Sequence, residues 1–172
     1  MPATRADLMD YLDELGIKTE THDHEAVFTV EESSKIKQDI PGGHTKNLFL
    51  KDKKGNFFLL VAEGSARIEL NKVHGLIGAS GRVSFGKPDM LMALLGITPG
   101  SVTAFCAMND TENVVQVVID EPLLKHDLIN CHPLTNEATT TISREDLLAF
   151  LKAVGHPPLV VKVSQDGDDN EQ

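Results

Sequence analysis

Polar side chains that could do chemistry gather at three points of the 172-residue sequence. The first is His44-Thr45-Lys46-Asn47, which follows Pro41-Gly42-Gly43 and enters a predicted strand. Neighbours on a strand point to opposite faces, so one of Lys46 and Asn47 can face a pocket while the other braces a neighbouring loop. The alternative is an ordinary strand entry with Lys46 in water.

The second point is the loop Gly96-Ile97-Thr98-Pro99-Gly100-Ser101, between a predicted helix and a predicted buried strand. A loop with two glycines and a proline can present successive backbone N–H groups to an anion or to a developing oxyanion. A simple turn explains the same composition, and the residues alone leave both interpretations open.

The third point is Asn130-Cys131-His132-Pro133, with Asn136 shortly after it. The ordinary pKa of histidine, about 6.5, allows His132 to act as an acid–base group or as a structural hydrogen-bonding group. A nucleophilic Cys131–His132 pair is disfavoured because strand neighbours face opposite ways.

A run of potential metal ligands, His22-Asp23-His24-Glu25, also occurs near the N-terminus. An alternating exposed strand explains this run better than a metal site does. The sequence has no Cys-x-x-Cys pair and no His-Glu-x-x-His run, so zinc sites lack their usual sequence support. We therefore expect no metal.

Alternating helical and strand patterns predict the elements that must position these groups. Thr4 with Asp7, and Ser143 with Asp146, match helix-capping signals, and Pro88 suits a first helical turn. The expected helices cover 4–16, 29–37, 70–76, 88–95 and 144–154, and the expected strands cover 17–24, 46–51, 57–62, 83–85, 102–107, 114–119, 128–131, 138–142 and 159–163.

Hairpins interspersed with helices predict an α+β fold with a mixed, largely antiparallel sheet. No Gly-x-Gly-x-x-Gly or Walker loop joins a strand to a helix, which argues against a Rossmann or P-loop nucleotide-binding protein. The length suits one domain, which we place at 1–164, followed by an acidic tail at 165–172 that we expect to be disordered.

The charge is unevenly distributed along the chain. The net charge is −10, yet residues 35–87 hold 10 Lys and Arg against 4 Asp and Glu. A local basic face can steer a polyanion, although lysines on one solvated hairpin explain the same count. With no signal peptide and no apolar run of about 18 residues, we expect a cytoplasmic protein with reduced Cys106 and Cys131 and no membrane partner.

The three segments together resemble the YbaK/ProX family of aminoacyl-tRNA editing domains, in particular its free-standing prolyl-tRNA-editing proteins of the PrdX or ProXp-ala type. The matching stretches are HTKNLFLKDKKGNFFLLVAE (44–63), GITPGSVTAF (96–105) and NCHPLTNEATTTIS (130–143). The resemblance implies a sheet curled toward a barrel and surrounded by helices. It also implies hydrolysis of the ester in a mischarged tRNA, with Ala-tRNA for proline as the expected substrate.

The resemblance further assigns the candidate residues. Lys46 corresponds to the family's essential lysine, Asn47 is its neighbour, and His132 is the histidine near the substrate. The candidate substrate-binding residues are His44, Thr45, Gly96, Pro99, Gly100, Ser101 and Asn136. An ester is already activated, so positioning and oxyanion stabilisation suffice, with no cofactor. The expected partner is the aminoacylated acceptor end of tRNA, with prolyl-tRNA synthetase as a further candidate, and we expect a monomer.

Selectivity for alanine requires a wall that excludes the larger proline ring, because size exclusion is the strong direction of discrimination. Val27, Phe28 and Val30 are candidates for this wall, and ordinary core packing is the alternative for each of them. Two other functions compete with editing. One is a non-catalytic protein that binds a tRNA end or an amino acid in the same pocket, and the other is an unrelated thiol or metal hydrolase.

Overall fold

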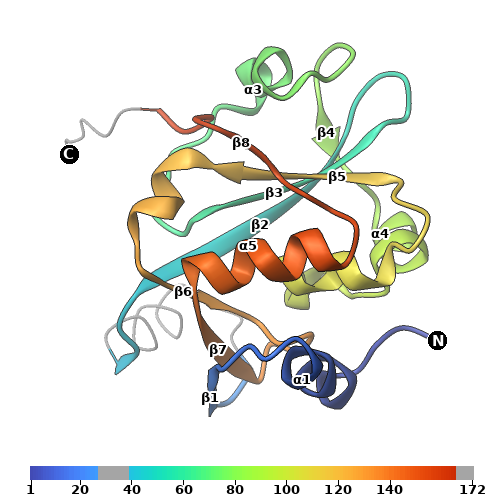
Figure 1. Ribbon diagram of the computed structural model, residues 1–172. Coiled ribbons are helices and arrows are strands. Elements are labelled where there is room, and N and C mark those ends of the chain that lie inside the picture. The colour runs from blue at the N-terminus through green and yellow to red at the C-terminus, as the bar shows by residue number, and fades with distance from the viewer. Residues whose placement is uncertain (27–38, 166–172) are drawn as a thin grey trace.

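The sheet has eight strands and β2 lies at its centre. The computed structural model describes residues 1–26 and 39–165. The strand order is β1-β7-β6-β2-β3-β5-β8, and β4 pairs with β2 on the outside of this path (Figure 1). The strands are β1 (Glu20–Asp23), β2 (Gly43–Lys51), β3 (Phe57–Glu63), β4 (Ser84–Phe85), β5 (Val115–Asp120), β6 (Leu128–Cys131), β7 (Ala138–Ser143) and β8 (Leu159–Val161).

The pairing is mixed, as the sequence predicts. β1 with β7, β6 with β7, and β2 with both β3 and β4 are antiparallel. The pairs β2–β6, β3–β5 and β5–β8 are parallel. The sheet is curved, and it stays open because β1 and β8 end the strand path without pairing with each other.

Helices cover the sheet unequally. The helices are α1 (Arg5–Glu14), α3 (Leu70–Ile77), α4 (Pro88–Leu95) and α5 (Arg144–Ala153), with short 3-10 helices η1 (Pro99–Ser101), η2 (Ala104–Asn109) and η3 (Glu121–Lys125). Side chains of α1, α4, α5 and η2 pack into a first core, and those of α3 pack into a smaller second core. Figure 1 shows α3 at the end of the molecule away from α1. None of the described helices is long and apolar enough to cross a membrane.

Alternation along the central strands assigns side chains to these two cores. Phe49 of β2, Leu59 of β3 and Val117 of β5 belong to the first core. Leu50, Leu60 and Val118, each one residue further along, belong to the second core. Because both faces are buried there, these strands are continuous apolar runs in the sequence.

The helix ends follow the expected signals. Thr4 and Asp7 form a complete capping box, and the Ser143 hydroxyl accepts the Asp146 N–H. Pro88 occupies the first turn of α4, and Gly96 closes that helix with φ +61°, a conformation that favours glycine.

Several predicted elements are corrected by the structure. The segment 102–107 is not a strand, because residues from Ala104 onward form the 3-10 helix η2, whose first turn is capped by the Thr103 hydroxyl. Its small residues Ala104, Cys106 and Ala107 lack the β-branching that favours strands. The strand predicted for 17–24 is shorter, as is that for 159–163, and the helix predicted for 29–37 falls outside the described residues.

One buried carboxylate organises the turn between β2 and β3. Asp52 accepts backbone N–H bonds from Ser80 (2.8 Å), Asn56 and Lys54 (both 2.9 Å) and a side-chain bond from the Asn56 amide. Burial alone would raise the pKa of Asp52, but these donors outweigh burial and lower the pKa to about 2. The ionised carboxylate therefore ties the hairpin to the segment after α3.

We expect Asp52→Asn to lower the urea midpoint of unfolding at neutral pH. A depressed folded-state pKa contributes stability that is complete above the unfolded-state pKa of about 4 and is lost as the pH falls toward about 2. The difference between wild type and variant should therefore shrink across that interval. Urea unfolding followed by circular dichroism from pH 7 to pH 2 measures it, and a difference independent of pH would contradict the assignment.

Candidate functional site

Lys46 and Asn47 lie on opposite faces of β2, as alternation predicts. The Lys46 ammonium donates to the backbone carbonyl of Ala66, just beyond the end of β3. The Asn47 amide instead donates to the carbonyl of Val102 at 3.1 Å, which ties β2 to the loop after α4. The other amide atom of Asn47, Oδ1, is buried and has no partner among the described residues.

The face that holds Lys46 turns polar toward β1. In the strand registers, His44 of β2 pairs with Asn130 of β6, and Asn130 pairs with Thr141 of β7. Side chains two residues apart along a strand point to the same face. Lys46, two residues after His44, and His132, two residues after Asn130, therefore lie on this face. We call this surface the polar face; its side chains include His24, His44, Lys46, Asn130, His132, Thr139 and Thr141.

Hydrogen bonds hold the polar face together. The Asn130 side chain is buried, donates to the Pro41 carbonyl at 3.1 Å and accepts the Thr141 hydroxyl. His44 Nε2 lies 2.8 Å from the Ile40 carbonyl. On the other side of the same strands, the Thr45 hydroxyl donates to the Asn130 carbonyl at 2.8 Å. The start of β2 is therefore fixed against β6 from both faces.

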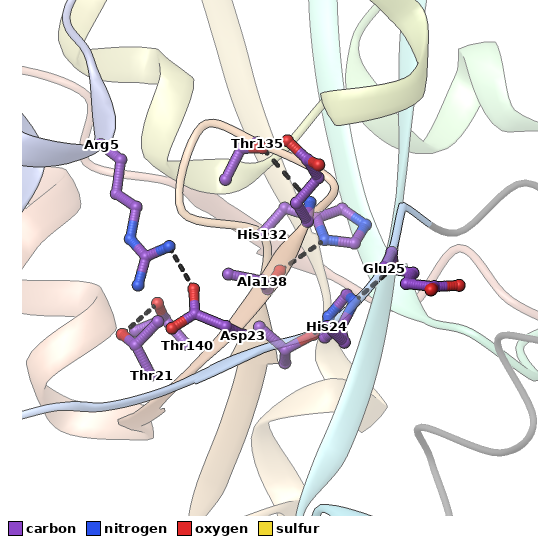
Figure 2. A network of polar contacts seen from close by, with 11 residues as sticks. Arg5, Thr21, Asp23, His24, Glu25, His132, Thr135, Ala138 and Thr140 are labelled. Carbon is purple, nitrogen blue, oxygen red and sulfur yellow. Dashed lines mark hydrogen bonds and ion pairs between the residues drawn. The ribbon is translucent and has the colours of Figure 1, made fainter.

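His132 follows β6 directly, and its ring orientation is set by the backbone of β7. Its Nδ1 lies 3.3 Å from the Ala138 carbonyl, which can only accept, so Nδ1 carries the proton of the neutral ring (Figure 2). Nε2 of the neutral ring then keeps its lone pair and can accept a proton. Burial is the main cause that lowers the pKa of His132; the Ala138 bond opposes it and the charge of His24 adds to it.

His24 anchors to the same stretch of β7 as His132. Its backbone N–H donates to the Glu137 carbonyl at 2.9 Å, and its Nε2 lies 2.9 Å from the Thr139 hydroxyl. Figure 2 shows His24 and His132 on neighbouring segments, with Asp23 turned instead toward Arg5 of α1. From the sequence, His24 was expected in an exposed strand. Strand alternation sets its side chain opposite that of Asp23, and this pattern could have indicated its place on the polar face.

The glycine loop meets the hairpin that carries His132. A side chain at Gly100 would contact the Asn136 amide nitrogen at 3.6 Å, so the second and third sequence segments adjoin. The N–H of Ser101 already donates to the Thr98 carbonyl at 3.0 Å within η1. Leu134, in the hairpin loop, has φ +65°, a conformation that costs a non-glycine residue energy and that recurs at functional sites.

The two thiols are unsuited to nucleophilic chemistry. Cys106 and Cys131 are both buried in the first core, and burial raises the pKa of each thiol to about 12. Cys131 faces away from His132 and accepts the Thr45 hydroxyl at 3.9 Å. Within the described ranges, 1–26 and 39–165, no group of three or more His, Cys, Asp or Glu side chains could hold a metal ion.

The structure thus brings most of the predicted site residues into two adjoining groups. His44, Lys46 and His132 share the polar face, whereas Thr45 and Asn47 brace it from the core side. Pro99, Gly100, Ser101 and Asn136 belong to the adjoining loops. Gly96 instead ends α4, where a side chain would meet Pro2 and Asn109. The three candidate wall residues, Val27, Phe28 and Val30, lie outside the described residues.

Comparison with known proteins identifies the family of the chain. Residues 24–150 match the family model of the aminoacyl-tRNA editing domain. The chain is 37% identical over 161 residues to the mouse (Mus musculus) prolyl-tRNA synthetase associated domain-containing protein 1, covering 91% of this chain and 95% of that protein. It is 38% identical over 146 residues to the prolyl-tRNA editing protein ProX of Acetoanaerobium sticklandii, covering 84% and 88% respectively.

Solved structures share the fold at lower sequence identity. A candidate trans-editing enzyme for prolyl tRNA synthetase superposes with a TM-score of 0.69 and 20% identity, covering 96% of this chain and 99% of that one. The structural match extends over nearly the whole chain, and the family model includes both Lys46 and His132. The chain therefore belongs to the aminoacyl-tRNA editing domain family.

Proposed function

We propose that this protein is a trans-editing deacylase that hydrolyses the ester of mischarged tRNA, with Ala-tRNA for proline as its substrate. The observation that carries the proposal is that alternation along the paired strands β2 and β6 leads to Lys46 and His132 on the same polar face. The ProX relative of Acetoanaerobium sticklandii, a prolyl-tRNA editing protein by name, supports the choice of tRNA.

The geometry suits attack by water on an ester without a protein nucleophile. Lys46 supplies positive charge on the polar face, where the carbonyl oxygen of the ester gains negative charge. His132, with its free Nε2 lone pair, orients the attacking water or the ribose 2′-hydroxyl beside it and can accept a proton. The bond between the carbonyl carbon and the ribose 3′-oxygen then breaks, and the 3′-oxygen takes up a proton.

The remaining residues position this pair. Asn47 holds the loop after Ser101 through the Val102 carbonyl, and Asn136 adjoins Gly100. The Ser101 N–H already donates to the Thr98 carbonyl. We therefore assign stabilisation of the negative charge on the oxyanion chiefly to Lys46. The high pKa of both thiols, about 12, favours this water-based reaction over the thiol hydrolase considered above.

A basic surface at the far end of β2 suits the phosphates of the same tRNA. Lys51 of β2 pairs with Ser84 of β4, and the Lys53 N–H donates to the Ser80 carbonyl, so the hairpin and the segment before β4 form one surface (Figure 1). Its exposed basic side chains are Lys51, Lys53, Lys54, Arg82 and Lys87. Lys51 lies five residues beyond Lys46, about 17 Å along the strand.

The first prediction tests the proposed reaction. We expect the purified protein to deacylate Ala-tRNA for proline faster than the Ser- and Cys-tRNAs and to leave Pro-tRNA intact. Lys46→Ala should lower kcat/KM by about 100-fold or more, because it removes charge stabilisation of the transition state. Lys72→Ala, which removes an exposed lysine of α3, is the matched control and should react like wild type.

Two outcomes would count against the proposal. Near-normal turnover by a folded Lys46→Ala variant would remove Lys46 from the site. Binding of aminoacyl-tRNA with no turnover of any member of the panel would favour the non-catalytic binding protein instead.

A second prediction concerns pH. The reaction needs neutral His132, so kcat/KM should fall as the pH drops through the pKa of this ring. Because that pKa is lowered, the fall should come at a pH below the ordinary histidine value of about 6.5. Single-turnover rates from pH 4.5 to 8, compared with the His132 ring titration followed by NMR, check the assignment. A rate profile that does not follow the titration would remove His132 from proton transfer.

A third prediction concerns the basic surface. The double variant Lys53→Ala/Lys54→Ala should raise KM for aminoacyl-tRNA and leave kcat unchanged, because these lysines are remote from the ester. The slope of log affinity against log salt should become shallower by about 2, close to one for each lost phosphate contact. Lys152→Ala on α5 is the control. Unchanged KM and salt slope in the double variant would place the RNA elsewhere.

A further inference from the structure

Asp120 is a buried carboxylate that the reaction described above does not use. It ends β5, and its exposed fraction is 0%. Its Oδ1 accepts the N–H of Val163 at 2.8 Å and the N–H of Ser164 at 3.1 Å. Its Oδ2 is buried and has no hydrogen-bond partner among the described residues. A buried carboxylate oxygen without a partner is costly, which calls for a nearby positive charge.

The strand registers place Asp120 in line with Lys46. Lys46 pairs with Ala62 of β3, and Val61 pairs with Ile119 of β5, so Asp120 is the next neighbour of Ala62. Alternation puts all three residues on the face that holds the second core, since Leu60 and Val118, two residues earlier, belong to it. The Cα atoms of Lys46 and Asp120 are therefore two strand spacings apart, about 10 Å. The intervening side chain is only the methyl group of Ala62.

A second connection runs through the backbone. Ser164, held by Asp120, forms a β-bridge with Ile68, and the N–H of Gln165 donates to the Arg67 carbonyl at 2.7 Å. The preceding residue, Ala66, supplies the carbonyl that receives the Lys46 ammonium. Asp120 thus anchors the chain segment that holds Lys46.

We propose that Asp120 is the positioning residue for Lys46: its Oδ1 fixes the segment that carries the Ala66 carbonyl, and its Oδ2 supplies the negative charge that keeps the half-buried ammonium charged and oriented. The proposal rests on the function assigned to Lys46 above. Water is largely excluded around Asp120, so its charge is weakly screened over this distance.

Asp120→Asn separates the two actions. Asparagine keeps an oxygen that accepts the Val163 and Ser164 N–H groups, but it removes the negative charge. We expect the folded variant to lower kcat/KM for Ala-tRNA at least tenfold, mostly through kcat. We also expect the Lys46 ammonium to titrate at lower pH than in wild type, as observed by NMR of the lysine Cε–Hε groups. The titration needs no substrate, so it tests the coupling even if the proposed reaction is wrong.

Asp52→Asn is the matched control, because it removes another buried carboxylate near the opposite end of β2. It should destabilise the fold and leave the Lys46 titration unchanged. A folded Asp120→Asn variant with a wild-type Lys46 titration would overturn the proposal and leave Asp120 a purely structural anchor. If Asp120→Asn does not fold, Asp120→Glu, which keeps the negative charge, is the second variant. It should fold with kcat near that of wild type, and a folded Asp120→Glu variant with kcat as low as that of Lys46→Ala would overturn the proposal.

Discussion

The two-residue period of β2 is the constraint on which the rest of the site depends. Lys46 and Asn47 can serve different surfaces only because strand neighbours face opposite ways. A slip of one residue would turn Lys46 into the first core and Asn47 onto the polar face. The register is protected by burial, since Phe49 and Leu50 each fill a different core. The packing of Phe49 and Leu50 therefore fixes the faces to which Lys46 and Asn47 point.

A polar surface at the centre of a sheet is tolerated only when its buried groups find partners. Asn130 shows how this is met: its amide bonds to Pro41 and Thr141, so both of its side-chain atoms are engaged. The Ala138 carbonyl plays the same part for His132 and also selects the tautomer. The hydrogen bonds that stabilise this face are thus the ones that orient the side chains to which we assign the reaction.

Local signals in the sequence predicted the elements whose ends carry side-chain caps or whose apolar pattern has a clear period. The Thr4 and Ser143 caps, the Pro88 helix and the β2–β3 hairpin are examples. The segment 102–107 was predicted wrongly because a short apolar run does not distinguish a buried strand from a buried 3-10 helix. The parallel pairs of β2 with β6 and β3 with β5 join distant segments, so no local pattern specifies them.

The difference between local signals and pairing of distant segments also explains which candidate site residues could be found from the sequence. Lys46, Asn47 and His132 stand in compact motifs, whereas Asp120 is the last residue of an apolar strand and has no polar neighbour in sequence except Glu121. Its relation to Lys46 exists only through the registers of β2 with β3 and of β3 with β5. In the function we propose, Lys46 and His132 act on the substrate and stand in local sequence motifs, whereas the order of the strands brings Asp120 to Lys46. The proposed ester hydrolysis depends on fixed charge rather than on a protein nucleophile. It would therefore need both kinds of residue, because the ammonium must be held charged and in place before the ester arrives.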